Sequence, residues 1–378
     1  MKNLGLYIHI PFCIKKCDYC DFYSLCHDER LEEEYINALC SHIKKDAYLY
    51  KDYSFDTVFF GGGTPSVLSI KSFDKLVNCI KTNLTLTQGG EFTIEANPGT
   101  LNREKLECYK RNGVNRLSIG LQSTNDNELC GLGRIHTLSE FEQGYYLARE
   151  CGFDNISIDI MYGLPNQKLD DFKKTLDHVC EFNSEHISAY CLKIEENTPF
   201  GKKQDALNLP NDDEEYEMYM ALCEALNEKG WQQYEISNFA KENYRSRHNL
   251  KYWLSQEYIG FGPSSHSFFD GERYFYQRDI KKYIEGVCNG TPSRVLESEA
   301  DETHINKMDE YVLLKLRLSD GISLSEFKNR FNKDFLNEYP NIEKYVKTDH
   351  VSINGDIYSF TPKGFFVSNY ILTDILHF

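Results

Sequence analysis

The chain has 378 residues, of which 41% are hydrophobic and 26% charged, a composition typical of a globular protein rather than a disordered or membrane-embedded one. Its formal net charge of -16 argues against non-specific binding to nucleic acid, which needs clustered lysine and arginine. The longest mainly apolar stretches, such as residues 156–161 and 311–318, are far shorter than the roughly 20 residues of a membrane span. Because the first residues do not resemble a signal peptide, we expect a cytoplasmic protein.

Short runs rich in β-branched and aromatic residues alternate with longer amphipathic stretches in the first half of the chain. The runs predict six strands, at residues 6–10, 57–60, 92–96, 116–121, 156–161 and 187–192. The intervening stretches predict helices at residues 31–50, 70–82, 102–112, 139–151 and 169–182. Roughly 30 residues per strand-helix unit is the spacing that parallel strands with helical crossovers require. We therefore expect an α/β fold, a partial (β/α)6 barrel of the TIM type, with a doubly wound open sheet as the alternative.

The pattern changes after residue 200. A helix is predicted at residues 211–229, and an aromatic, glycine-rich region follows it to about residue 276. Residues 308–318 and 323–331 then predict two helices, and residues 351–353 and 357–360 predict two strands joined by the turn Asn354-Gly355. Helices followed by a hairpin predict a small α+β module of the winged-helix type, whose excess of acidic residues argues against nucleic-acid binding. We divide the chain into a core barrel at residues 1–235, a linking region at 236–300 and a C-terminal module at 301–378.

Three of the thirteen cysteines lie close together, at Cys13, Cys17 and Cys20. Cysteine thiolates hold cubane iron-sulfur clusters, and three thiolates bind only three of the four irons, so the last iron can take another ligand. A structural zinc site usually takes four ligands in two pairs, and no second C-x-x-C pair follows. Zinc completed by a distant His or Cys is the alternative. The cysteine motif therefore predicts a 4Fe-4S centre with one open iron.

Polar features occur where several predicted strands end. A Gly-Gly-Gly-Thr sequence (residues 61–64) follows the second strand, Glu95 and Gln122 end the third and fourth, and Asp159 lies on the fifth. Each could have a purely structural role in a turn, a loop cap or a hydrogen bond. In a parallel barrel, however, the carboxyl ends of all strands open on one face. These groups and the cysteine loop are therefore predicted to meet at a single ligand site.

The CxxxCxxC spacing, with Tyr19 before the third cysteine, resembles that of the radical S-adenosylmethionine (radical SAM) superfamily. The string YIHIPFC (residues 7–13) and the later motifs resemble the coproporphyrinogen dehydrogenase (HemN) family and its HemW branch. The resemblance implies a radical SAM core barrel in which S-adenosylmethionine chelates the open iron and can be cleaved to a 5′-deoxyadenosyl radical. It implies S-adenosylmethionine contacts at Tyr7, Gly62, Gly63, Thr64, Glu95, Gln122, Arg134 and Asp159. Arg134 suits this role because a guanidinium pairs with a carboxylate through two hydrogen bonds, with a surface salt bridge as the alternative.

Two departures from the dehydrogenase pattern resemble the HemW branch, whose members are haem chaperones. Asp21 and Phe22 follow the third cysteine, where the dehydrogenases have a further cysteine, and the cluster motif comes almost at the start, where those enzymes have a substantial preceding segment. Residues 247–253 (RHNLKYW) also resemble the HNxxYW motif of that branch, which implies haem contacts at His248, Asn249, Tyr252 and Trp253. Neutral imidazole is a common haem-iron ligand and aromatic faces pack on porphyrins, so His248 is the candidate iron ligand and His266 a second one. An ordinary packed turn is the alternative for His248.

We therefore expect a haem chaperone that binds haem, a 4Fe-4S cluster and S-adenosylmethionine and passes haem to an acceptor protein, without coproporphyrinogen dehydrogenase activity. The expected acceptor is a membrane-bound haem protein, which would bring the chain to the membrane surface. The cluster and S-adenosylmethionine are expected to control haem transfer or homodimerisation. The alternative function is a radical SAM oxidoreductase of the oxygen-independent coproporphyrinogen III dehydrogenase type. A third, non-catalytic interpretation is a zinc-binding scaffold.

Overall fold

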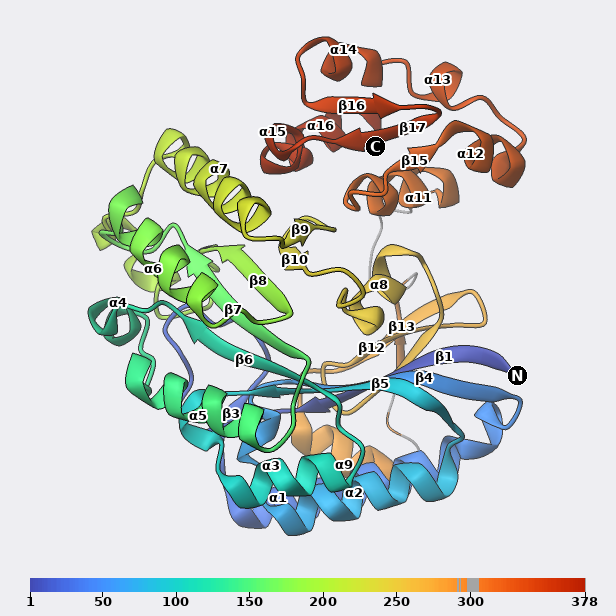
Figure 1. Cartoon of the computed structure of the whole chain (residues 1–378). Helices are drawn as coiled ribbons and strands as arrows, with labels where there is room; N and C mark the ends of the chain where they lie inside the picture. Colours follow the sequence, from blue (N-terminus) through green and yellow to red (C-terminus); the bar gives the residue numbers. More distant parts are fainter. Residues whose placement is uncertain (291, 293, 298–305, 378) are drawn as a thin grey trace.

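The computed structural model describes residues 1–290, 292, 294–297 and 306–377 (Figure 1). The six predicted strands are confirmed and run parallel in one sheet, in the order β1-β4-β5-β6-β7-β8. Their bounds are β1 Lys2–Ile10, β4 Tyr53–Gly62, β5 Leu86–Ala96, β6 Arg116–Gln122, β7 Ile156–Tyr162 and β8 His186–Cys191. Neighbours in this part of the sheet are also successive along the chain, whereas the strand order of a doubly wound sheet reverses. The barrel-type α/β fold is thus confirmed, and the doubly wound alternative is wrong.

The predicted crossover helices lie together on one face of the sheet (Figure 1). Their buried sides form a continuous aromatic and aliphatic core with the strands, in which Phe60 of β4 lies 5.6 Å, ring to ring, from Phe73 of α2. Local caps fix where they begin: the Ser69 side chain accepts a hydrogen bond from the Ser72 amide at the start of α2. The bounds are α1 Glu29–Asp46, α2 Ile70–Asn83, α3 Arg103–Arg111, α4 Asp126–Gly131, α5 Leu138–Glu150 and α6 Leu169–Glu181, with 3-10 turns η1 Ala47–Tyr50, η2 Pro65–Val67 and η3 Pro98–Thr100.

Short strands extend this sheet at both edges. On one side β11 (Tyr258–Phe261) runs parallel to β1 and leads into an antiparallel ribbon of β12 (His266–Phe269), β13 (Glu272–Tyr276) and β14 (Arg294–Leu296). On the other side β10 (Asn238–Ala240) pairs antiparallel with β8 and with β9 (Gln232–Gln233). The described part of the predicted linking region therefore continues the barrel sheet. It also contains α8 (Arg247–Trp253) and α9 (Ile280–Cys288).

The C-terminal module has the predicted mixture of helices and a hairpin. The Asn354-Gly355 turn joins β16 to β17, and Gly355 has a φ of 64°, which an L-residue adopts only with strain. A third strand, β15, pairs with β17. The predicted boundary between residues 300 and 301 lies outside the described residues. The bounds are α11 Lys307–Leu316, β15 Ile322–Ser323, α12 Leu324–Phe331, α13 Phe335–Glu338, α14 Ile342–Lys347, β16 Val351–Asn354, β17 Ile357–Phe360, α15 Pro362–Phe366 and α16 Ser368–Ile375.

Helix α7 (Asp212–Glu228) forms the contact surface between the barrel and this module. It follows the 3-10 turn η4 (Gly201–Ala206). The ring of Phe366 in α15 lies 5.3 Å from that of Tyr216 and 5.7 Å from that of Tyr219, both in α7. An ion pair between Arg245 and Asp320, at 2.9 Å, adds a second contact. The module therefore packs beside α7 and lies above α8 in Figure 1. Among the described residues, no helix is both long and apolar enough to cross a membrane.

Candidate cluster and ligand cavity

The three clustered cysteines lie on a loop that leaves the carboxyl end of β1. Strand β2 (Phe12–Cys13) pairs with β3 (Leu25–Cys26) and closes the loop that carries Cys17 and Cys20. All three side chains line one cavity. Within the described ranges, no three His, Cys, Asp or Glu side chains lie close enough to hold a single ion. A cubane cluster takes each of its thiolates at a separate corner, so its cysteines need not converge on one point.

The glycine sequence at the end of β4 is packed against the start of this loop. Gly62 has a φ of 111°, and a Cβ atom there would come within 2.5 Å of the His9 ring. A Cβ atom on Gly63 would lie 2.8 Å from the backbone of β2. The next side chain reaches the cluster motif directly, because Thr64 Oγ1 lies 3.4 Å from Cys13 Sγ. The glycines are therefore required for close approach of the two loops, in addition to any contact with a ligand.

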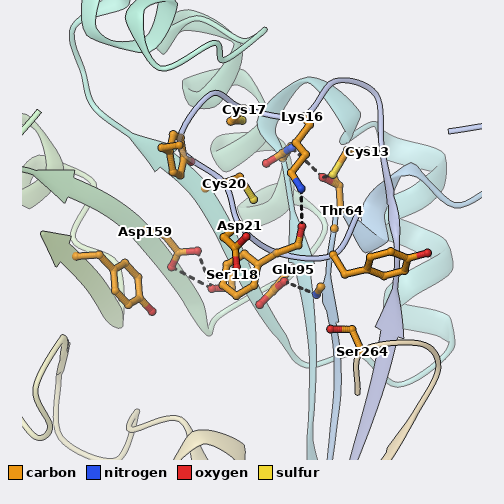
Figure 2. A pocket seen from close by; sticks show the side chains of 18 of the residues that line it. Cys13, Lys16, Cys17, Cys20, Asp21, Thr64, Glu95, Ser118, Asp159 and Ser264 are labelled. Carbon is orange, nitrogen blue, oxygen red and sulfur yellow. Dashed lines mark hydrogen bonds between the residues drawn. The ribbon is translucent and has the colours of Figure 1, made fainter. Parts of the chain in front are cut away.

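Two half-buried carboxyl groups face the cavity from neighbouring parts of the sheet (Figure 2). Glu95 on β5 accepts a hydrogen bond from the Gly62 amide at 3.2 Å. Burial, and then the nearby Asp159, raises the pKa of Glu95 to about 8. Asp159 on β7 accepts hydrogen bonds from Ser118 at 3.0 Å and Ser157 at 3.1 Å, and burial raises its pKa. A cationic ligand would offset the repulsion between these two acids.

Arg134 lies beside the cysteine loop and reaches the backbone of β6. Its guanidinium donates to Asn97 Oδ1 at 2.8 Å and to the Gly120 carbonyl at 2.7 Å, and it lies 3.6 Å from Cys17 Sγ. Its Nε is buried without a hydrogen-bond partner among the described residues. Gln122 reaches the cavity from a bulge in β6, where it has a φ of 72°. Asn97 was not predicted from the sequence, although its position just after Glu95 at a strand end is a signal.

The cavity has a volume of about 870 Å³, which is near the upper end for small-molecule sites, typically about 300–1,000 Å³. In Figure 2 the three cysteines lie above Glu95 and Asp159, and Ser264 lies below and to the right of them. Every residue that was predicted to contact S-adenosylmethionine lines this cavity. Lining residues that were not predicted include His9, Asn97, Ser118, Tyr190, Lys193, Tyr258 and Arg278. Tyr190 comes from β8, which pairs with β7, and Tyr258 comes from β11, whose parallel pairing with β1 no local pattern reveals.

Of the HNxxYW residues, His248 lies behind the cavity wall, whereas Tyr252 forms part of that wall. His248 has no exposed surface, and its Nδ1 lies 2.8 Å from Thr57 Oγ1 while its Nε2 lies 2.8 Å from the Tyr252 hydroxyl. Burial lowers the pKa of His248 to about 3. Of the four predicted haem residues, all of them described, only Tyr252 lines the cavity. Trp253 points instead toward the C-terminal module, where the Arg317 guanidinium lies 6.0 Å from its ring centre. In this conformation both His248 nitrogens are engaged within the protein.

Comparison with known proteins agrees with this architecture. The family model described as the Radical SAM superfamily matches residues 7–179, and the HemN C-terminal domain model matches residues 303–367. The solved structure of coproporphyrinogen III oxidase (HemN) from Escherichia coli superposes with a TM-score of 0.85 at 22% identity, covering 99% of this chain and 90% of that one. This likeness concerns the fold.

Relatives of known name match over nearly the whole length. Heme chaperone HemW of Buchnera aphidicola subsp. Schizaphis graminum is 37% identical over 98% of both chains, and that of Bacillus subtilis is 36% identical over 89% of both. Heme chaperone HemW of Escherichia coli is 37% identical over 86% of both chains. The chain therefore belongs to the HemW family of the radical SAM superfamily.

Proposed function

We propose that this chain is a haem chaperone that carries a 4Fe-4S cluster, binds S-adenosylmethionine in the cavity and passes haem to an acceptor protein. The observation that carries the cofactor assignment is the meeting of the three clustered cysteines with Glu95 and Asp159 around one cavity. The haem assignment rests on membership of a family whose relatives are named Heme chaperone HemW. A bound cluster would supply an open iron that can hold S-adenosylmethionine and an electron that can cleave it.

The residues present suit both cofactors. Cys13, Cys17 and Cys20 offer thiolates for three irons and leave the fourth open. S-Adenosylmethionine carries a sulfonium and an amino group, so it supplies the positive charge that the Glu95 and Asp159 pair calls for. Its carboxylate suits the unpartnered Nε of Arg134. The remaining proposed contacts are Tyr7, Gly62, Gly63, Thr64 and Gln122.

Anaerobic reconstitution tests the cluster. The full-length chain is expected to take up iron and sulfide in equal amounts, and S-adenosylmethionine should change the electron paramagnetic resonance spectrum of the reduced cluster. Replacing Cys13, Cys17 and Cys20 together by Ala should abolish both signals. Cys130→Ala, at an exposed cysteine outside the loop, is the matched control and should leave them unchanged. A cluster that survives the triple replacement, or reconstituted protein that holds zinc alone, would overturn the assignment.

Haem titration tests the chaperone function. The intact chain is expected to bind haem, to release it to an acceptor, and to form no protoporphyrinogen from coproporphyrinogen. For the HNxxYW residues, iron ligation by His248 would require its hydrogen bonds to Thr57 and Tyr252 to break.

We propose a membrane-bound haem protein as acceptor. We also propose cluster-dependent dimerisation, which sedimentation with and without the cluster would detect. Joint formation of 5′-deoxyadenosine and protoporphyrinogen would instead establish the dehydrogenase.

A further inference from the structure

The ribbon formed by β11, β12 and β13 presents an aromatic face to the cavity. Tyr258 pairs with Phe268, Phe268 pairs with Arg273, and His266 pairs with Phe275. Directly paired residues in antiparallel strands project from the same face of a sheet, and so do alternate residues along one strand. All five side chains therefore share one face. Tyr258 and His266 line the cavity, and Phe268 and Phe275 continue the same face beyond the cavity lining.

On this face, the His266 side chain is both accessible to solvent and held in one orientation by its neighbours. Its side chain is 54% exposed, and its ring stacks on Phe275 with 5.1 Å between ring centres and 25° between planes. Its Nδ1 lies 3.1 Å from Glu297 Oε1. An ionised carboxylate can only accept a hydrogen bond, so Nδ1 carries the proton and the lone pair lies on Nε2. Among the described residues, no hydrogen-bond partner is found for that nitrogen.

A carboxylate behind a histidine is the arrangement that proteins use to orient imidazole toward a metal. The hydrogen bond fixes the ring and its tautomer and raises the basicity of the other nitrogen. His248 differs in each respect, because it is fully buried and both of its nitrogens have partners. Of the two histidines predicted from the sequence as haem-iron ligands, His266 is the one that can reach an iron without a conformational change.

We propose that His266 is the axial ligand of the haem iron, with Glu297 orienting it and the Phe268 and Phe275 rings packing against the porphyrin. The assignment rests on the proposed haem-binding function and names its ligand. Both phenylalanines are partly exposed, as a surface that receives a flat apolar ligand should be. Arg278 and Lys193 line the same cavity and pair there with Asp21 at 3.4 Å and Glu195 at 2.7 Å. Binding of the two haem propionates would exchange these ion pairs for new ones. His248 then holds Tyr252 in the cavity wall and does not touch the iron.

The test is titration of the full-length chain with ferric haem, followed by absorption and electron paramagnetic resonance spectra. Replacing His266 by Ala should weaken haem binding by about tenfold or more and change the axial-ligand signature, and added imidazole should restore that signature. Glu297→Gln should weaken binding by about tenfold at most, because the ligand remains but its orienting carboxylate is lost. His178→Ala is the matched control, since His178 also pairs with a carboxylate, Glu142 at 3.1 Å, but lies on α6 away from the cavity lining. Circular dichroism should show that all variants fold.

The outcomes separate this inference from the function on which it rests. Loss of the axial-ligand signature in H266A but not in H178A or H248A supports the assignment. If H266A keeps the wild-type affinity and spectrum while H248A loses them, the HNxxYW histidine is the ligand and the assignment is wrong although the chaperone function stands. If the wild-type chain binds no haem, the proposed function fails and the assignment fails with it.

Discussion

Glu95 is the residue whose environment makes the sharpest prediction about pH. Its folded-state pKa of about 8 lies above the ordinary value of 4.5, so between these values the folded chain holds a proton that the unfolded chain has lost. Stability should therefore fall as pH rises through this window. Glu95→Gln cannot ionise, and at pH 8.5 we expect it to be more stable than the wild type by roughly 1–3 kcal/mol. Urea denaturation of the cluster-free chain at pH 6 and pH 8.5 measures the change.

A second variant serves as the control for this measurement. Glu34 is exposed on α1 and pairs with Arg30 at the surface, so Glu34→Gln should follow the wild type at both pH values. The difference between Glu95→Gln and the wild type should be smaller at pH 6 than at pH 8.5. A difference that stays constant with pH would mean that Glu95 is already ionised in the folded chain.

Among the secondary-structure elements, the parallel strands could be predicted from sequence and the ribbon beside them could not. Strands such as Ile156–Tyr162 are rich in isoleucine and other apolar residues because both of their faces are buried, so each can be recognised from its own few residues. In contrast, β11 has four residues, one of them glycine, and its parallel partner β1 lies at the other end of the barrel sequence. The pairing that places His266 at the cavity is therefore a long-range property. The HNxxYW motif could likewise be recognised from its own residues. The hydrogen bond between His248 and Thr57 could not be predicted, because it joins residues far apart in the sequence.

Helix α8, which carries the HNxxYW residues, is held at its start by a buried side chain of β5. Glu91 accepts hydrogen bonds from the amides of Arg247 at 2.9 Å and His248 at 3.0 Å. Glu91→Ala leaves two amides without acceptors, and we expect a loss of roughly 2–4 kcal/mol of unfolding free energy. Hydrogen exchange should rise within residues 247–253. Glu91→Gln keeps one acceptor oxygen and should lose less, whereas unchanged exchange in both variants would contradict this anchoring role.

At the scale of the whole molecule, local signals identify the two parts and long-range contacts join them. The hairpin turn at Asn354-Gly355 reveals the C-terminal module because its signal is contained within a few residues. No such signal reveals that the module rests on α7, since that contact depends on rings far apart in the sequence. An isolated antiparallel bridge between Glu235 and Leu318 and the approach of Arg317 to Trp253 join the module to the barrel near the HNxxYW helix. A conformational change in α8 would therefore act on residues that contact the module.

Phe366 offers the most direct test of this docking. Its ring packs against Tyr216 and Tyr219 of α7, so Phe366→Ala removes most of an aromatic contact while leaving the cores of both parts intact. Because the side chain is only partly buried, we expect a loss of roughly 1–3 kcal/mol, below the usual range for a fully buried phenylalanine. Hydrogen exchange should rise in residues 212–219 and 362–366 and stay unchanged in the central strands. Tyr370→Ala removes an aromatic ring that is 67% exposed on the same module and should have no such effect; equal exchange in the two variants would show that the module is held by its polar contacts instead.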